Sequence, residues 1–137
     1  MKNTIISALL FFSATNVLAD IIKYEDVSTA GARRFGDIVV RHVRTLGSPC
    51  LDIQALSWDS EWKVVSARNF CSFEGKSFET DVTDASFENI YFARDGIQMD
   101  LSLTPLAPTG ETIRTCFVPV KDGRIGDIVC SAPRRPE

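Results

Sequence analysis

Apolar and polar residues alternate with a period of two over much of the chain, which is typical of half-buried β-strands. The clearest case is residues 97–104, whose apolar positions are Ile97, Met99, Leu101 and Leu103. Arg94-Asp95-Gly96 precedes this segment as a turn signal, and residues 87–93 form the other strand of an expected hairpin. No helical periodicity of useful length and no internal repeat is visible, so the pattern predicts an all-β protein.

Further strands are expected at 21–24, 37–44 and 112–120. Pro119 favours an edge position for the last of these, because proline cannot donate a hydrogen bond to a sheet. Residues 28–33 are mostly small and polar, which favours a loop or hinge. Seven or so short strands separated by turn signals predict an immunoglobulin- or fibronectin III-like β-sandwich.

Two segments are expected to be less regular. Residues 75–86 are polar, and a loop, a short helix and an irregular edge strand all remain open there. The tail from Ala132 contains two prolines and is expected to be loose.

The first 19 residues are typical of a cleaved signal peptide. Lys2 is followed by a short apolar run, and Val17-Leu18-Ala19 ends on the small residue that precedes a cleavage site. We expect cleavage after Ala19 and a single domain over residues 20–137. The run is too short to span a bilayer. The sequence therefore predicts an exported protein without membrane insertion, secreted or periplasmic.

An even number of cysteines in an exported chain of this size predicts two disulfides, and the four residues are Cys50, Cys71, Cys116 and Cys130. Four cysteines allow three pairings. If Cys116 faces Cys130 in a hairpin, the loop is Asp122-Gly123-Arg124, which has suitable turn chemistry. If Cys50 faces Cys71, the loop is Ser60-Glu61, a poor two-residue turn that favours a longer connection. Hairpin geometry thus favours the pairs Cys50–Cys71 and Cys116–Cys130.

Both tryptophans flank the expected Ser60-Glu61 loop. In that register Trp58 and Trp62 point to opposite faces, with one in the core and the other at least partly exposed. An exposed tryptophan near a turn is a candidate contact residue. The alternative is that it closes the end of the core, since small domains need their large side chains there.

Composition and motifs do not point to catalysis. The formal charge is −3, or −4 without residues 1–19, which argues against nucleic acid. G-x-S-x-G is absent, the single histidine His42 lies in an expected strand, and all four cysteines are assigned to disulfides. A non-enzymatic protein without cofactor or metal is expected. Four acids lie close together in sequence: Glu79, Asp81, Asp84 and Glu88. They could bind calcium or form a solvated acidic loop, and the loop is favoured because the residue spacing of an EF-hand is missing.

The chain resembles the interleukin receptor mimic family of small secreted enterobacterial proteins. The resemblance is carried by the signal MKNTIISALLFFSATNVLA, the β pattern of IYFARDGIQMDLSLTPL and TCFVPV, and a mature domain of the size of one fibronectin module. The Trp-Ser-x-Trp-Ser box of cytokine receptors is absent, because SWDSEW has a different spacing, so no family residue is carried over by position. The resemblance implies a fibronectin III-like fold, strand exchange into a dimer, virulence and binding to host cytokines.

The sequence therefore predicts an exported β-sandwich that binds another protein. Candidate contact residues are Trp58, Trp62, Tyr24, Tyr91 and Phe92, with Arg41 and Arg44 as rim charges. An N-terminal strand joined by Ser28-Thr29-Ala30-Gly31-Ala32 could exchange between protomers of a homodimer. The alternative is a periplasmic inhibitor or immunity protein that blocks a toxin or lysozyme, favoured if the 75–86 segment projects acids toward a basic cleft.

Overall fold

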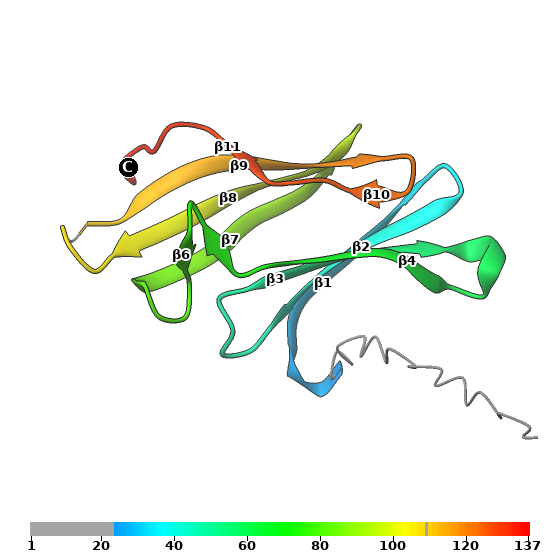
Figure 1. Ribbon diagram of the computed structural model, residues 1–137, viewed down its shortest axis with the longest axis horizontal. Coiled ribbons are helices and arrows are strands. Elements are labelled where there is room, and N and C mark those ends of the chain that lie inside the picture. Colours follow the sequence, from blue (N-terminus) through cyan, green and yellow to red (C-terminus); the bar gives the residue numbers. More distant parts are fainter. Residues whose placement is uncertain (1–23, 109) are drawn as a thin grey trace, which may run out of the picture.

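Two antiparallel β-sheets packed face to face form the molecule, as described by a computed structural model for residues 24–108 and 110–137 (Figure 1). Each sheet has one apolar face, and packing the two together removes both from water. The fold is the predicted all-β sandwich with two disulfides. It shares the packing of two antiparallel sheets with immunoglobulin- and fibronectin III-like domains. Neighbouring strands follow one another in sequence, except that β11 pairs with β9.

The first sheet is a four-stranded meander in the order β1-β2-β3-β4. Its strands are β1 (Val27–Phe35), β2 (Ile38–Thr45), β3 (Leu51–Ser57) and β4 (Lys63–Phe70). Two short 3-10 helices, η1 (Tyr24–Asp26) and η2 (Trp58–Ser60), precede β1 and follow β3. The strand expected at 37–44 is confirmed as β2, whereas residues 21–23 of the first expected strand and the signal segment lie outside the described residues.

The second sheet has the order β10-β9-β8-β7, and β11 also pairs with β9. Its strands are β7 (Val82–Ala93), β8 (Gly96–Pro105), β9 (Thr112–Lys121), β10 (Arg124–Ile125) and β11 (Val129–Cys130). The expected hairpin of residues 87–93 and 97–104 is confirmed, with Phe87 opposite Leu101. A separate two-stranded hairpin, β5 (Ser72–Phe73) and β6 (Lys76–Ser77), joins the two sheets.

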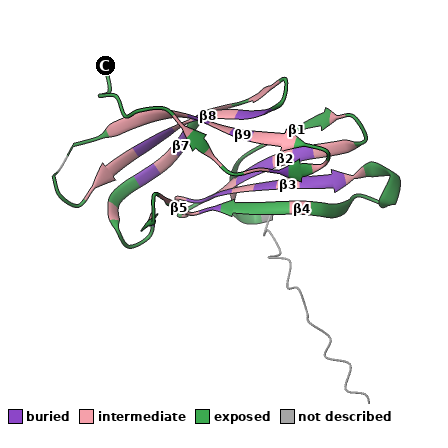
Figure 2. Ribbon diagram, turned by 45° about the horizontal axis from the view of Figure 1, so that its top comes forward, coloured by how far each residue is buried: buried purple, intermediate pink, exposed green. Residues whose placement is uncertain are grey.

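The core lies between the sheets and follows the alternation seen in the sequence (Figure 2). The largest side chains that are almost fully buried come from both layers: Phe87, Leu51, Ile53, Ile97, Met99 and Leu101. Burying a side chain of this size stabilises the fold by about 1.5–3 kcal/mol. The outward positions of the same strands are more exposed, as the pink and green bands of Figure 2 show.

Both disulfides join the pairs that hairpin geometry favours, Cys50–Cys71 and Cys116–Cys130. Cys116 lies opposite Cys130 in the register of β9 and β11, as expected. The turn is one residue tighter than expected, because Lys121 already pairs with Arg124. The two remaining loop residues have positive φ angles of 51° at Asp122 and 74° at Gly123, which suits a two-residue hairpin turn.

The prediction of a loop or hinge at 28–33 is wrong, because these residues lie inside the edge strand β1. Gly31 faces His42 on β2, and a Cβ at Gly31 would lie 2.5 Å from His42 Nε2. The small residues therefore let β1 pack over the imidazole rather than weaken the chain. Pairing with β2 fixes the conformation of a segment whose own strand propensity is low.

The polar segment 75–86 contains three short pieces. It begins in the β5–β6 hairpin, passes through a turn, and enters β7 at Val82. The turn is closed by Asp81, whose backbone N–H donates to the Ser77 carbonyl (2.9 Å) and whose carboxylate accepts from the Ser77 N–H (2.8 Å). Of the three conformations left open, the irregular strand is the nearest to what is observed.

Two expectations about the C-terminal part are wrong. β9 pairs with β8 on one side and with β10 and β11 on the other, so Pro119 does not mark a sheet edge. Pro119 lies between the part of β9 that pairs with β10 and the part that pairs with β11. Its lack of an N–H therefore costs no hydrogen bond to these strands, while its carbonyl accepts from the Gly126 N–H (2.8 Å). The tail is also held in place, because Ile113 and Arg134 exchange two backbone hydrogen bonds of 2.8 Å.

Candidate functional site

Four hairpin turns lie together at one end of the sandwich, on the right of Figure 1, and we call this the hairpin end. They are the turns at residues 35–38, 57–63, 93–96 and 121–124. Arg33 connects two of them, because its guanidinium donates to the carbonyls of Phe92 (3.2 Å) and Ala93 (3.3 Å). Val120 connects another pair through its N–H, which donates to the Asp95 carbonyl (2.8 Å).

The β3–β4 connection does not have the expected two-residue loop. Leu51 to Ala55 keep the expected register with β4, but a bulge after Ala55 moves Ser57 opposite Lys63. The chain then turns through η2 and two left-handed residues, Glu61 (φ 55°) and Trp62 (φ 63°). Positive φ is unusual for a bulky side chain and stores backbone strain.

This connection presents both tryptophans to solvent. Trp58 is 47% exposed and Trp62 is 57% exposed, so the expectation that one of them is in the core is wrong. The bulge and the longer turn carry both residues beyond the last paired position of the hairpin. The Arg34 guanidinium lies 4.8 Å from the centre of a Trp58 ring, a cation–π contact that holds this indole over the outer side of β1 and β2.

The exposed apolar surface continues into β4. Val64 pairs with Leu56, Val65 is the residue that the bulge leaves unpaired, and both are exposed. We call Trp58, Trp62, Val64 and Val65 the tryptophan tip. Sequence reasoning did not single out the two valines. The signal was present, since two adjacent valines break the alternation expected of a half-buried strand.

The other aromatic candidates do not join the tryptophan tip. Tyr91 is 50% exposed, and it lies on the outer face of the second sheet, opposite Gln98. Phe92 faces inward and contacts the rings of Phe35 and His42, with centroids 6.0 Å and 5.5 Å away. Tyr24 begins η1, and its side chain lies outside the described residues.

The two rim arginines lie on opposite faces of β2. Arg41 points outward, where its Nε donates to Gln54 Oε1 on β3 (2.8 Å). Arg44 lies three residues further on, on the inward side with His42, and lines a cleft at the other end of the sandwich. A single rim formed by both side chains is therefore not present.

His42 has a pKa below its usual value. Burial lowers this pKa by disfavouring the charged imidazole, and the nearby Arg44 lowers it further. Nδ1 is buried without a hydrogen-bond partner, which favours a neutral packed ring in this strand.

The four acids considered for calcium do not converge. Within the described ranges, the only group with metal-ligand spacing is Cys50, Cys71 and Glu79, and both sulfurs are in a disulfide. Asp81 is used to close its own turn. The two disulfides are compatible with an extracellular or periplasmic protein.

No helix among the described residues is long and apolar enough to cross a membrane. The chain was also compared with family models, curated proteins and solved structures, and nothing matches it.

Proposed function

We propose that this chain is a non-catalytic protein-binding sandwich whose contact surface is the tryptophan tip. The observation that carries the proposal is a group of four exposed large apolar side chains within residues 58–65, on one turn and the start of β4. Tryptophan is among the residues most enriched in binding hot spots. Charged neighbours surround the tip, as in the polar rim of an interface: Arg34, Asp59, Glu61 and Lys63.

The strained backbone of the tip supports the same proposal. Stability alone would favour glycine or asparagine at positions with positive φ, yet the chain has Glu61 and Trp62 there. Each such residue costs about 1–3 kcal/mol. The exposed indole of Trp62, kept at this cost, supports a role in binding a partner.

We propose host cytokines as the first partner class, following the resemblance to the interleukin receptor mimic family, with export as the route and virulence as the role. A homodimer formed by exchange of β1 belongs to the same proposal. The hinge would be Gly36-Asp37 rather than residues 28–32, because those lie inside the strand. Light scattering on the purified chain gives the oligomeric state.

The test is binding of the mature chain to immobilised cytokines by interferometry. Trp58→Ala and Trp62→Ala should each weaken binding by at least about thirtyfold, as for hot-spot residues. Tyr91→Ala is the matched control, an equally exposed aromatic residue on the outer face of the other sheet. Equal losses for all three variants would contradict the tip as contact surface. Absence of binding to every cytokine would contradict the partner class.

A toxin or lysozyme inhibitor is a second candidate, favoured by the exposed acids of the 78–85 segment. Glu79 and Asp84 are exposed there, whereas Asp81 is tied into its turn. Inhibition of a basic lysozyme should be lost in the double variant Glu79→Gln/Asp84→Asn and retained in Trp62→Ala. Retention in the acid variant would reject this candidate.

A further inference from the structure

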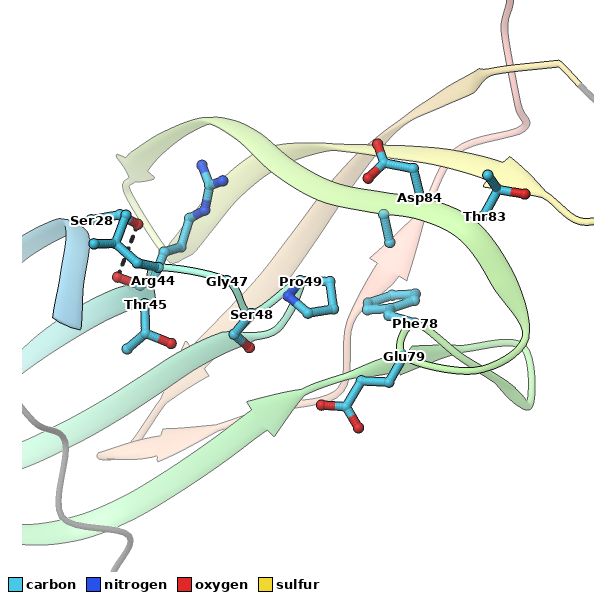
Figure 3. A pocket seen from close by; sticks show the side chains of 12 residues that line it. Ser28, Arg44, Thr45, Gly47, Ser48, Pro49, Phe78, Glu79, Thr83 and Asp84 are labelled. Atoms are coloured by element: carbon cyan, nitrogen blue, oxygen red, sulfur yellow. Dashed lines mark hydrogen bonds between the residues drawn. The ribbon is translucent and has the colours of Figure 1, made fainter.

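A polar cleft lies at the end of the sandwich away from the hairpin turns, and we call this the loop end (Figure 3). One wall is the β2–β3 connection at residues 45–49, and the other is the segment 78–85 that leads into β7. The volume of the cleft is about 720 Å³. Small-molecule sites have volumes in this range.

The floor of the cleft is apolar and belongs to the core. Phe78 and Ala85 are buried, and Pro49 lies beside them. The Phe78 ring meets the core residue Phe87 edge to face, with centroids 5.8 Å apart. A ligand with an apolar body would therefore find a surface that core packing already fixes.

The charged groups on the two walls have opposite sign. Arg44 comes from the β2 side, and Glu79 and Asp84 come from the 78–85 side. In Figure 3, Arg44 and Asp84 lie along one border of the cleft, while Glu79 lies across the Phe78 floor. Within residues 24–108 and 110–137, ion pairs are formed by Arg68, Arg114 and Arg134, and the three charged cleft residues form none.

Both walls are braced by hydrogen bonds. The Leu46 N–H donates to the Asp26 carbonyl (2.7 Å), and Ser28 Oγ donates to the Arg44 carbonyl (3.2 Å). Across the cleft, the Phe78 N–H donates to the Cys71 carbonyl (3.0 Å). Because Cys71 is bonded to Cys50, directly after Pro49, the disulfide ties the two walls together. Braced walls lower the ordering cost of binding.

We propose that this cleft binds a short zwitterionic ligand, such as a peptide with free termini. The ligand carboxylate pairs with Arg44, its ammonium group pairs with Asp84, and its apolar part rests on Phe78. This site is independent of the proposed contact at the tryptophan tip, since the two lie at opposite ends of the sandwich.

The mixture of charges selects this class over simpler ones. An anionic ligand would meet the repulsion of Glu79 and Asp84, and a cationic ligand would meet that of Arg44. A guanidinium from β2 and a carboxylate from the 78–85 segment instead suit two opposite charges on one molecule, and each pair forms a charge-assisted hydrogen bond.

The test uses the isotope-labelled mature chain and the tripeptide Gly-Leu-Gly, followed by amide chemical shifts. The free peptide should shift amides of residues 45–49 and 78–85, with a Kd of about 1 mM. N-acetylation, C-amidation, Arg44→Gln and Asp84→Asn should each weaken binding by about tenfold. Spectra away from the cleft report whether each variant is folded.

Matched controls keep the result specific to the cleft. Arg41→Gln removes an arginine from the opposite face of the same strand, and Glu88→Gln removes an acid further along β7. Both should bind the free peptide as the unmodified chain does. Equal binding of a doubly blocked peptide, equal loss in Arg41→Gln, or no shift at the cleft would each overturn the proposal. Loss of cytokine binding in the tip variants would leave this result unchanged.

Discussion

The two ends of the sandwich are built on the same strands and present opposite surfaces. At the hairpin end, a strained turn pushes apolar side chains outward, whereas at the loop end two longer connections surround a charged hollow. The difference arises in the connections between strands, because β2 and β3 run from one end to the other and contribute buried side chains along their length. A convex apolar projection suits a protein partner, and a concave charged cleft suits a small ligand.

Removing one disulfide at a time should give the largest difference in hydrogen exchange between the two ends. Cys50→Ala/Cys71→Ala opens a loop with a sequence separation of 21 and should lower the free energy of unfolding by about 3 kcal/mol. Hydrogen exchange should accelerate first at residues 45–49 and 78–85, because this bond ties the cleft walls together. Exchange at the tryptophan tip should change less, because this turn lies at the far end of the β3–β4 hairpin from the disulfide.

The second disulfide is the control for that experiment. Cys116→Ala/Cys130→Ala opens a loop with a separation of 14, so a similar loss of stability is expected. Its local effect should fall on β9, β11 and the tail bonded to Ile113, away from the cleft walls. If both double variants loosen the cleft equally, the disulfide Cys50–Cys71 has no particular part in bracing it.

Gly31→Ala tests the strand that lies between the two ends. The added methyl group would lie 2.5 Å from His42 Nε2, and this buried ring has little room to move. Overpacking of this kind should lower the free energy of unfolding by about 1–3 kcal/mol. Denaturant unfolding measures it, with exchange expected to rise in β1.

The His42→Ala background shows whether the imidazole is the cause. There the methyl group has space, so Gly31→Ala should cost much less than in the parent chain. An equal cost in both backgrounds would place the strain in the backbone of β1 instead.

The sequence is informative about the layers and less so about the ends. Alternation located β8, the expected strands at 37–44 and 112–120 match β2 and β9, and the cysteine positions gave the register of two hairpins. β1 was missed because its small residues serve a contact with His42, which only the folded pair of strands creates. Strand pairing here overrides local propensity.

The tryptophan tip was predicted in part, for a reason of the same kind. The tryptophans were identified, yet their direction depends on a bulge after Ala55 and on positive φ at Glu61 and Trp62. Neither the bulge nor the two positive φ angles occurs at a glycine or asparagine, the residues from which such a conformation is predicted in a sequence. The cleft was not predicted because Arg44 and the 78–85 segment meet only through the packing of one sheet on the other.

Acidification should loosen the structure through His42, which lies beside Arg44 on β2. Burial lowers the pKa of this imidazole below about 6.5, its value in an unfolded chain. Between the two pKa values the unfolded state binds more protons, so stability present above about pH 6.5 is lost as the pH falls toward the folded pKa. One proton gives a slope of at most about 1.4 kcal/mol per pH unit.

The measurement is the free energy of unfolding across this pH window, compared with His42→Phe. All other ionisable groups are common to the two proteins, so the difference between the two curves isolates the imidazole of His42, the single histidine of the chain. Identical slopes would show that the ring is already free to ionise. If the peptide affinity of the cleft changes with pH in the same way, protonation of His42 is coupled through β2 to binding at Arg44.

The smallest expected change in stability comes from Trp62→Gly, which separates the two uses of the hairpin end. Glycine adopts the φ of 63° without strain from a Cβ, so the free energy of unfolding should stay equal or rise by about 1 kcal/mol. Partner binding should be lost at the same time, because the exposed indole is gone. Denaturant unfolding and interferometry on one sample measure both.

Trp58→Gly is the counterpart, because Trp58 lies in η2 without positive φ. This variant should also lose partner binding. Its free energy of unfolding should fall by about 0.5–1 kcal/mol, since there is no backbone strain at residue 58 for glycine to relieve. A loss of stability in Trp62→Gly as large as in Trp58→Gly would mean that the indole of Trp62 supports the fold. The strain at Trp62 would then be explained by packing, and the hairpin end would differ from the loop end in shape alone.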